Sequence, residues 1–278
     1  MFDYFPLVQP FIYRFDPEKA HKIALFALKH NLLPKQPEIS DPMLASRHFN
    51  LDFKNPIGLS AGFDKNAEAI PGLVHQGFGF IETGTSTPRP QEGNPRPRLF
   101  RLTEDSAIIN RLGMPNKGSE SYILKLKEFK AKRGIYPQVV MGANIGKNKD
   151  TEDDKADYLT MLRAVYDSCD YITLNISSPN TPGLRQLQKK DMLAGLVNAV
   201  TTTRRELAQQ QGNHVPILVK IAPDLTEDEQ TDIAEIIMAS GIDGLVVGNT
   251  TISQRSRLKS AHAQETGGLS GKPLFALS

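Results

Sequence analysis

The sequence predicts an α/β fold: a (β/α)8 barrel of the TIM type preceded by a small helical extension. From about Asn55 onward, short apolar runs alternate with longer helical patterns. Such alternation is typical of parallel strands joined by crossover helices. Each apolar run also ends in small or polar residues, and a barrel builds its ligand site from the C-terminal ends of its strands. A length of 278 residues suits one barrel with an extension.

Composition and charge exclude several classes of protein. The chain has 33 basic and 31 acidic residues, and its net charge of +2 is too small to indicate a nucleic-acid partner. The single cysteine, Cys169, excludes an internal disulfide framework and is compatible with a reducing compartment. No apolar run is long enough for a transmembrane helix, and no secretory signal is recognisable. The histidines are scattered, so no metal site is expected.

Residues 1–40 are expected to form the helical extension. Apolar residues recur at helical spacing from Phe5 to Phe15, but Pro10 lies inside that stretch and predicts a short or broken helix. A second helix is expected to begin with Asp16 as its N-cap and Pro17 in its first turn, and to stop between residues 31 and 34. Two interpretations stay open: the helices pack onto their own domain, or they lie on a membrane surface and admit a lipophilic substrate.

Residues 41–278 contain six predicted βα units. Strands are expected at Ile57–Ala61, Phe80–Thr83, Val139–Ile145, Tyr171–Ile176, Ile217–Ile221 and Leu245–Gly248. Helices are expected at Ala67–Gln76, Ser119–Lys132, Asp154–Ser168, Asp191–Gln210 and Glu227–Ser240. A glycine-rich turn is expected at Thr266–Gly271. Because a complete barrel has eight units, we expect the last two to be missing from this sequence, together with the loops that often bind phosphate.

Motifs of other enzyme classes are absent. The segment Gly142–Asn148 resembles a P-loop, but its two glycines are four residues apart and neither Ser nor Thr follows Lys147. No G-x-S-x-G elbow occurs, and no G-x-G-x-x-G opens a helix, so a hydrolase triad or a Rossmann site lacks support.

The remaining candidates for chemistry are amides, hydroxyls and two lysines at the strand ends. Asn side chains offer both a donor and an acceptor, which suits a planar imide or a flavin pyrimidine ring. Lys220 lies in an apolar strand, where it forms either an ion pair at the barrel rim or a fixed positive charge beside a flavin. Lys65 is a candidate for holding a substrate carboxylate, with Asp64 as its partner or as a turn residue.

Eight longer motifs follow one another along the chain. They are Phe53–Gly58, Ser60–Lys65, Gly84–Gln91, Gly93–Arg101, Asn144–Asn148, Asn175–Arg185, Lys220–Leu225 and Thr266–Gly271. By these motifs the chain resembles the quinone-reducing class of dihydroorotate dehydrogenases over essentially its whole length. The resemblance implies oxidation of dihydroorotate to orotate in pyrimidine synthesis, with FMN as hydride acceptor and a quinone that reoxidises the flavin.

The resemblance also assigns site residues. Ser178 would be the general base, and because soluble relatives carry Cys there, Ser178 favours the quinone class. The positions that match flavin contacts are Ala61, Gly62, Lys65, Thr85, Asn144, Asn175, Lys220, Gly248 and Gly271. The positions that match substrate contacts are Lys65, Asn110, Arg111, Leu112, Gly113, Met114, Asn175, Asn180, Asn249 and Thr250. His21 and Arg101 resemble residues at the quinone tunnel. We expect a peripheral membrane protein, on the cytoplasmic face of the cell membrane in a bacterium or on the inner mitochondrial membrane in a eukaryote.

The chain departs from the family pattern at three positions. Met114 stands in place of an aromatic residue, Pro115 in place of an amide, and Gly248 in place of a hydroxyl residue. Because the phosphate loops are expected to be missing, we expect this chain to bind FMN weakly or not at all. Two alternatives stay open: a soluble flavin oxidoreductase of the same barrel type that uses NAD or fumarate, and an inactive truncated barrel that serves as a binding partner.

Overall fold

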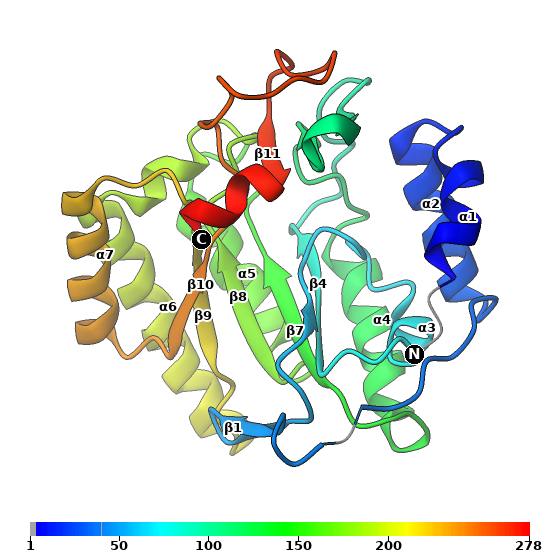
Figure 1. The fold of residues 1–278 in the computed structure, drawn as a ribbon. Helices are drawn as coiled ribbons and strands as arrows, with labels where there is room; N and C mark the ends of the chain where they lie inside the picture. Colours follow the sequence, from blue (N-terminus) through cyan, green and yellow to red (C-terminus); the bar gives the residue numbers. More distant parts are fainter. Residues whose placement is uncertain (1–3, 40) are drawn as a thin grey trace.

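The centre of the molecule is a curled parallel β-sheet with helices on its outer face (Figure 1). In this computed structural model, residues 4–39 and 41–278 are described. Residues 1–3 and 40, at the two ends of the predicted extension, lie outside the described residues. The sheet has six strands: β3 (Gly58–Leu59), β4 (Phe80–Ser86), β7 (Val140–Ile145), β8 (Tyr171–Asn175), β9 (Ile217–Ile221) and β10 (Gly244–Val247). They pair in chain order and every pairing is parallel, which confirms the predicted barrel-type α/β architecture.

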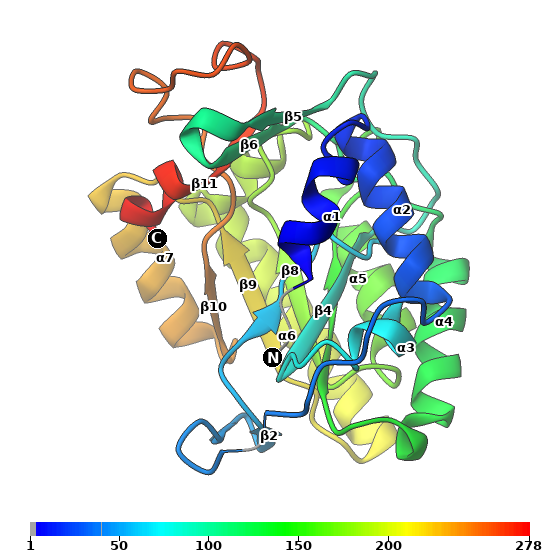
Figure 2. The ribbon, with the colours of Figure 1, turned by 45° about the vertical axis from the view of Figure 1, so that its right-hand side comes forward.

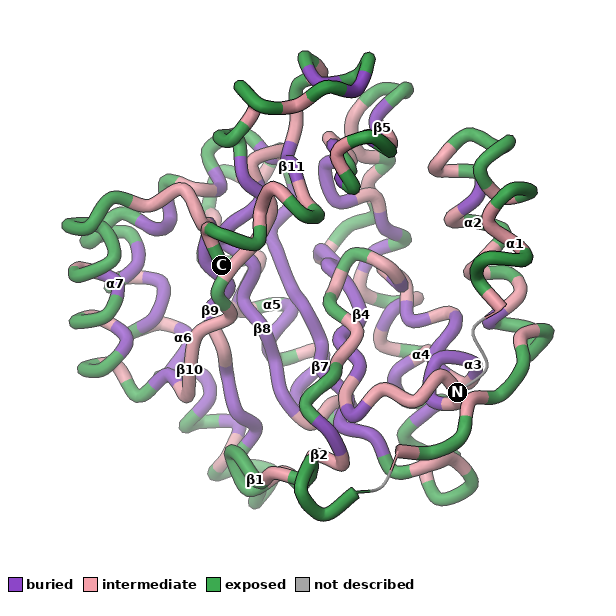
Figure 3. The backbone as a smooth tube through the Cα atoms, in the orientation of Figure 1, coloured by how far each residue is buried: buried purple, intermediate pink, exposed green. Residues whose placement is uncertain are grey.

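Five helices on the outer face connect successive strands of the parallel sheet. They are α3 (Ile70–Leu73), α4 (Ser119–Ala131), α5 (Asp154–Val165), α6 (Lys190–Gln211) and α7 (Glu227–Ser240). Side chains cap the N-termini of two of these helices. The Asp153 carboxylate caps α5, and Thr226 forms a capping box with Glu229 at the start of α7. Their apolar faces and the outer face of the sheet form the main hydrophobic core. The central strands β4, β7, β8 and β9 are almost entirely buried, whereas the edge strands β3 and β10 are partly exposed (Figure 3).

The predicted helix Ala67–Gln76 is wrong in length, because only Ile70–Leu73 is helical. Asp64 accepts hydrogen bonds from the backbone amides of Glu68 and Ala69, which holds the preceding residues in a turn. At Gly72 an added Cβ would lie 2.1 Å from the Leu28 carbonyl oxygen, so the short helix lies in close contact with the N-terminal extension. Tertiary contact therefore replaces the regular helix that the apolar pattern predicts.

Two antiparallel sheets were not predicted. A hairpin of β1 (Ser46–His48) and β2 (Leu51–Phe53) lies at the N-terminal edge of the parallel sheet. A three-stranded sheet of β5 (Leu99–Leu102), β6 (Ala107–Asn110) and β11 (Gly268–Gly271) lies beyond the opposite edge (Figure 2). The prediction of a glycine-rich turn at Thr266–Gly271 is thus wrong for its last four residues, because they form β11. Four 3-10 helices complete the fold: Thr103–Asp105, Arg133–Ile135, Leu184–Gln188 and Lys272–Leu277.

The extension forms the two predicted helices, α1 (Phe5–Ile12) and α2 (Pro17–Lys29). The Asp16 carboxylate accepts from the amides of Glu18 and Lys19, as expected of the N-cap. Two barrel arginines, Arg96 and Arg98, bind the Glu18 carboxylate and fasten α2 to the barrel. The hydrogen bond from Arg98 contributes most to lowering the pKa of Glu18 to about 2, so this carboxylate is ionised at neutral pH. Within the described residues, no helix is both long and apolar enough to cross a membrane.

Candidate active site

A network of polar side chains lies at the C-terminal ends of the central strands. It consists of Glu82 and Thr85 on β4, Asn144 on β7, Asn175 on β8, Ser177 after β8 and Asn249 after β10. We call these six residues the strand-end network. Asn144 Nδ2 donates to Glu82 Oε1 (2.8 Å), Thr85 Oγ1 donates to Asn144 Oδ1 (2.6 Å), and Asn175 Nδ2 donates to Thr85 Oγ1 (2.8 Å). Because parallel strands end at one edge, residues distant in sequence meet here.

Ser177 extends the network to a further strand end. Its hydroxyl donates to Asn175 Oδ1 (2.9 Å) and accepts from Asn249 Nδ2 (2.7 Å). Asn249 Oδ1 in turn accepts from the amide of Thr250 (2.8 Å). One continuous set of hydrogen bonds therefore connects five of the predicted site residues: Thr85, Asn144, Asn175, Asn249 and Thr250.

Arg185 ties three strand-end loops to one another. Its Nε donates to the Ser177 carbonyl (3.0 Å) and its Nη2 donates to the Thr250 carbonyl (2.9 Å). Its Nη1 forms an ion pair with Asp224, whose carboxylate also accepts from Thr251. The rigid fork of a guanidinium suits this role, because it fixes several acceptors at once.

Ser178 is buried and follows Ser177 of the strand-end network directly in the chain. Its Oγ accepts a hydrogen bond from the Asn180 amide (3.3 Å). Asn180 Nδ2 donates to the Asn110 carbonyl (3.1 Å) and to Asn110 Oδ1 (3.3 Å), so the loop after β8 contacts the end of β6. Ser178, Asn180 and Asn110 thus lie at the same edge of the sheet as the strand-end network.

Two lysines at the strand ends lack a carboxylate partner. Lys220 is buried, and its Nζ donates to Ser60 Oγ (3.3 Å) near the end of β3, several strands away from β9. The ion pair considered for Lys220 at the rim is not formed within the described residues. Lys65 donates to the Gly62 carbonyl. Burial and repulsion by Arg98 lower the pKa of Lys65 to about 8. Two ammonium groups without acidic partners fit an anionic ligand, such as a reduced flavin or a carboxylate substrate.

The backbone near these lysines leaves room for a ligand. An added Cβ on Gly62 would meet no atom within 4 Å, and one on Gly248 would meet its nearest atom at 3.5 Å. Gly248 therefore leaves open space beside the backbone after β10. Ala61 precedes Gly62 in the turn after β3. Gly271 lies apart from this cluster, in β11 beside Ala107 of β6.

The loop Arg111–Met114 forms a wall beside the network. The Met114 side chain is buried, with its Sδ 3.3 Å from the position of a Cβ on Gly146. The carbonyls of Gly113 and Met114 both accept from Gln91 Nε2 (3.1 Å each), and the Leu112 carbonyl accepts from the Asn94 amide (2.9 Å). The Arg111 guanidinium is engaged elsewhere, with the Glu265 carboxylate (2.7 Å) and over the Phe100 ring.

His21 and Arg101 join the N-terminal helices to the barrel at different places. His21 Nε2 lies 2.7 Å from the Phe63 carbonyl, one residue after Gly62. Burial and the charge of Lys65 lower the pKa of His21, so its imidazole is neutral at neutral pH. Arg101 donates to the Phe15 carbonyl (2.9 Å) and covers the Tyr13 ring. His21 thus joins α2 to the turn after β3, whereas Arg101 lies at the turn between α1 and α2.

The sequence interpretation missed several organising residues. Glu82 lies in an apolar run, and an isolated acid in a buried strand is the signal that could have marked it. Asn116 and Asn148 both donate to Thr87 Oγ1 (2.9 and 3.1 Å) and hold the loop after β4 against the wall. Neither amide stands out by local pattern.

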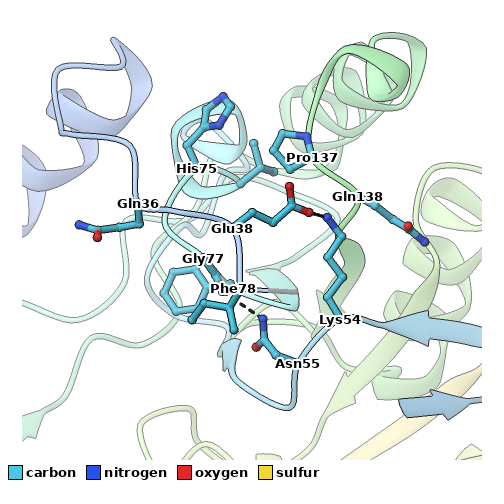
Figure 4. A pocket seen from close by; sticks show the side chains of 11 residues that line it. Gln36, Glu38, Lys54, Asn55, His75, Gly77, Phe78, Pro137 and Gln138 are labelled. Carbon is cyan, nitrogen blue, oxygen red and sulfur yellow. Dashed lines mark hydrogen bonds and ion pairs between the residues drawn. The ribbon is translucent and has the colours of Figure 1, made fainter. Parts of the chain in front are cut away.

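A small cavity lies far from this site, at the N-terminal edge of the sheet. Figure 4 shows its lining, in which Lys54 pairs with Glu38 and Asn55 donates to the Gly77 carbonyl. Lys54 and Asn55 precede β3, and Gln138 precedes β7. Its volume of about 30 Å³ has room for a few water molecules at most. It does not compete with the strand ends as a substrate site.

Comparison with known proteins agrees with this architecture. Residues 43–278 match the family model of dihydroorotate dehydrogenase. A dihydroorotate dehydrogenase (quinone) of Azorhizobium caulinodans is 49% identical over 276 residues, covering 99% of this chain and 77% of the relative. One of Sinorhizobium medicae is 50% identical over 268 residues, covering 96% of this chain and 72% of the relative.

Solved structures agree as well. The crystal structure of dihydroorotate dehydrogenase from Eimeria tenella in complex with ferulenol superposes with a TM-score of 0.91 at 42% identity, covering 95% of this chain and 74% of that one. The ligand-free form from the same organism gives a TM-score of 0.90 at 43% identity, with 95% and 77% coverage. The fold and the strand-end site define a flavin-dependent oxidoreductase built on an α/β barrel. This chain belongs to the dihydroorotate dehydrogenase family.

Proposed function

We propose that this protein oxidises (S)-dihydroorotate to orotate in pyrimidine synthesis and passes the electrons to a quinone. The observation that carries the proposal is Ser178, which lies beside a network of amides at the edge of the sheet that also carries two lysines with no ion pair among the described residues. Curated relatives about half identical to this chain are named dihydroorotate dehydrogenase (quinone).

FMN is the cofactor that these residues fit, and when bound it supplies the acceptor for the substrate's C6 hydride. The residues that would hold it are Ala61, Gly62, Lys65, Thr85, Asn144, Asn175, Lys220 and Gly248. Gly271 lies apart in β11, and only the resemblance to the family assigns it to the cofactor. Lys220 places a buried positive charge that favours the anionic form of the ring. No metal takes part in this scheme, and the described residues contain no group of ligands suited to one.

Lys65 would hold the substrate's carboxylate. The dione edge would be held by four side-chain amides, those of Asn110, Asn175, Asn180 and Asn249. Thr250 and the loop 111–114 would form the wall of the substrate site. Ser178 removes the C5 proton, so that loss of this proton and of the C6 hydride leaves the C5–C6 double bond. A serine hydroxyl is a weak base, and the Asn180 amide already donates to its oxygen. Ser178 must therefore pass its own proton outward as it accepts the substrate's.

The test is the rate of quinone reduction by dihydroorotate with FMN added in excess. Ser178→Ala should lower turnover by about 10²- to 10⁴-fold, the usual loss when a general base is removed. Ser240→Ala is the matched control, because this hydroxyl donates to the Ile237 carbonyl at the end of α7, remote from the strand ends. Wild-type turnover in Ser178→Ala would refute the assignment of the base.

The N-terminal helices support peripheral attachment to a membrane, where a quinone resides. No residue of α1 is buried, and Leu7 and Phe11 are 65% and 63% exposed. Basic side chains of the same segment, Arg14 and Lys19, lie beside the apolar ones and suit anionic lipid head groups. His21 and Arg101 would line the route of the quinone. In a bacterium the site of attachment would be the cytoplasmic face of the cell membrane, and in a eukaryote the inner mitochondrial membrane.

Sedimentation with anionic phospholipid vesicles tests this attachment. Leu7→Asp combined with Phe11→Asp should abolish sedimentation with the vesicles, whereas Phe275→Asp should leave it unchanged. Phe275 is a suitable control because it is 87% exposed but belongs to the C-terminal 3-10 helix, away from α1. Equal sedimentation of the double variant and the wild type would contradict membrane attachment through α1.

A further inference from the structure

Glu82 is a carboxylate buried inside the parallel sheet, where it is 5% exposed. Its two oxygens accept from Asn144 Nδ2 (2.8 Å) and from Thr173 Oγ1 (2.7 Å). It forms no ion pair within residues 4–39 and 41–278. A buried carboxylate without a cationic partner weakens the fold, which favours a functional reason for its presence.

The two oxygens of Glu82 determine how the neighbouring amide is turned. Both accept hydrogen bonds, and Asn144 presents its NH2 group to one of them. The Asn144 carbonyl oxygen then faces Thr85, whose hydroxyl must donate to it (2.6 Å). Because the single hydroxyl proton of Thr85 is used in this way, its oxygen is left as an acceptor.

The same direction continues through the rest of the strand-end network. The Thr85 oxygen accepts from Asn175 Nδ2 (2.8 Å), which turns the Asn175 carbonyl oxygen toward Ser177. Ser177 donates to it from both its backbone amide (3.3 Å) and its hydroxyl (2.9 Å). The Ser177 oxygen then accepts from Asn249 Nδ2 (2.7 Å). In every one of these bonds the donor is the partner farther from Glu82.

This order decides what the site offers to a ligand. The carbonyl oxygens of Asn144, Asn175 and Asn249 are all engaged with neighbours in the protein. Within the described residues, each NH2 group has one acceptor inside the network, which leaves its second hydrogen for a ligand. The site therefore presents amide donors, which match the ring carbonyls of a flavin and those of an oxidised pyrimidine acid.

We propose that Glu82 is a positioning residue that orients the Asn144 amide and, through it, the Thr85 hydroxyl, so that Asn144 donates toward the ligand; the backbone amides of Ser177 and Thr250 orient Asn175 and Asn249 in the same direction. The identity of that ligand rests on the proposed function. Glu82 itself acts through Asn144 and does not touch the substrate.

The first measurement is the affinity for orotate, determined by titration calorimetry with FMN in excess. Glu82→Gln keeps the shape of the side chain but can turn either an oxygen or an NH2 group toward Asn144, so the orientation of Asn144 and Thr85 is no longer imposed. Orotate affinity should fall by about 10- to 100-fold, the effect of one unsatisfied buried polar group. Thr173→Val is the matched control: it removes a donor to Glu82 that lies outside the strand-end network and leaves the network intact, so affinity should stay within about threefold.

The second measurement needs no ligand. Glu82 and Ser177 do not touch, so their substitutions should act independently on the unfolding equilibrium unless the network links them. A double-mutant cycle of Glu82→Gln and Ser177→Ala, followed by chemical denaturation, should depart from additivity by more than about threefold in the unfolding equilibrium constant. The cycle of Thr173→Val with Ser177→Ala should be additive.

The outcomes separate this proposal from the proposed function. Additive cycles together with unchanged orotate affinity in Glu82→Gln would overturn the role of Glu82. Coupled cycles in a protein that binds no orotate would support the direction of the network and overturn the proposed substrate. A similar loss of orotate affinity in Glu82→Gln and Thr173→Val would also overturn the role of Glu82, because it would show a general loosening of the site.

Discussion

Replacing Arg185 with methionine removes the guanidinium that holds three strand-end loops while keeping a side chain of similar length. The wild-type side chain donates to the Ser177 and Thr250 carbonyls and pairs with Asp224. Arg185 and Asp224 are 21% and 13% exposed, so water cannot fully replace these bonds. We expect the loop that carries Ser178 to lose its fixed position.

The expected loss of stability follows from the groups left without partners. Hydrogen bonds to a charged donor contribute about 1.5–3 kcal/mol each, and breaking a buried ion pair costs about 3–5 kcal/mol. Asp224 keeps its hydrogen bonds from Thr251 and Ile252, and both side chains of the pair are partly exposed. We therefore expect Arg185→Met to lower the free energy of unfolding by about 2–4 kcal/mol.

The ion pair should also depend on pH. Burial alone raises the pKa of Asp224, but hydrogen bonds from Thr251, Ile252 and Arg185 outweigh it and bring that pKa below its ordinary value. A depressed carboxyl pKa means that the stabilisation is present above the ordinary value and is lost as the pH falls through the lowered one. The stability difference between wild type and Arg185→Met should therefore shrink in acid.

Chemical denaturation and the quinone-reduction assay measure the two effects. Turnover of Arg185→Met should fall by at least about tenfold, because a displacement of about 1 Å in the reacting group can cost that much or more. Arg185→Lys is the matched control for charge, since it keeps the cation but lacks the planar fork that reaches the three separate acceptors. An Arg185→Met protein within about 0.5 kcal/mol of the wild type and with unchanged turnover would refute the role of the clamp.

Three further perturbations have defined outcomes. Because the pKa of Lys65 is lowered to about 8, orotate affinity should be present below that pH and decline above it, and Lys65→Gln should remove this pH dependence when measured by calorimetry. The pKa of Glu18 is lowered from 4.5 to about 2, so its ion pair with Arg98 stabilises α2 above pH 4.5 and is lost as the pH falls toward 2. The rate of hydrogen exchange in α2 should therefore rise as the pH falls through that range. A flat profile would argue against the ion pair. An added Cβ on Gly268 would lie 2.0 Å from Thr250 Oγ1, so Gly268→Ala should displace Thr250 and weaken orotate binding by about tenfold or more, whereas unchanged binding would place Thr250 outside the ligand site.

The parts of the fold that depend on local pattern were predictable. Apolar runs bounded by glycine and polar residues marked all six parallel strands. The central ones are apolar over most of their length because they are buried on both faces. Asp16 with Pro17 marked the start of α2 in the same way, since capping involves only neighbouring residues.

The parts that depend on distant contacts were not predictable. The segment Gly268–Gly271 reads as a turn by composition, yet it forms β11 because β6 supplies its partner strand from far away in the sequence. Glu82 illustrates the same limit within the site. In the chain it is an acid in an apolar run, and only the register of β4 with β7 and β8 places it beneath Asn144 and Thr173.

The sequence by itself therefore determined the architecture, the family and the chemistry of the strand ends, because periodicity and short motifs are properties of neighbouring residues. Which of those polar groups touch one another was decided only by the tertiary structure. The curled sheet brings the ends of β4, β7, β8 and β10 to one edge, and there Glu82 and Arg185 orient groups that local pattern could only name. Hydrogen bonds have direction and short range, so their arrangement follows from strand register and not from composition.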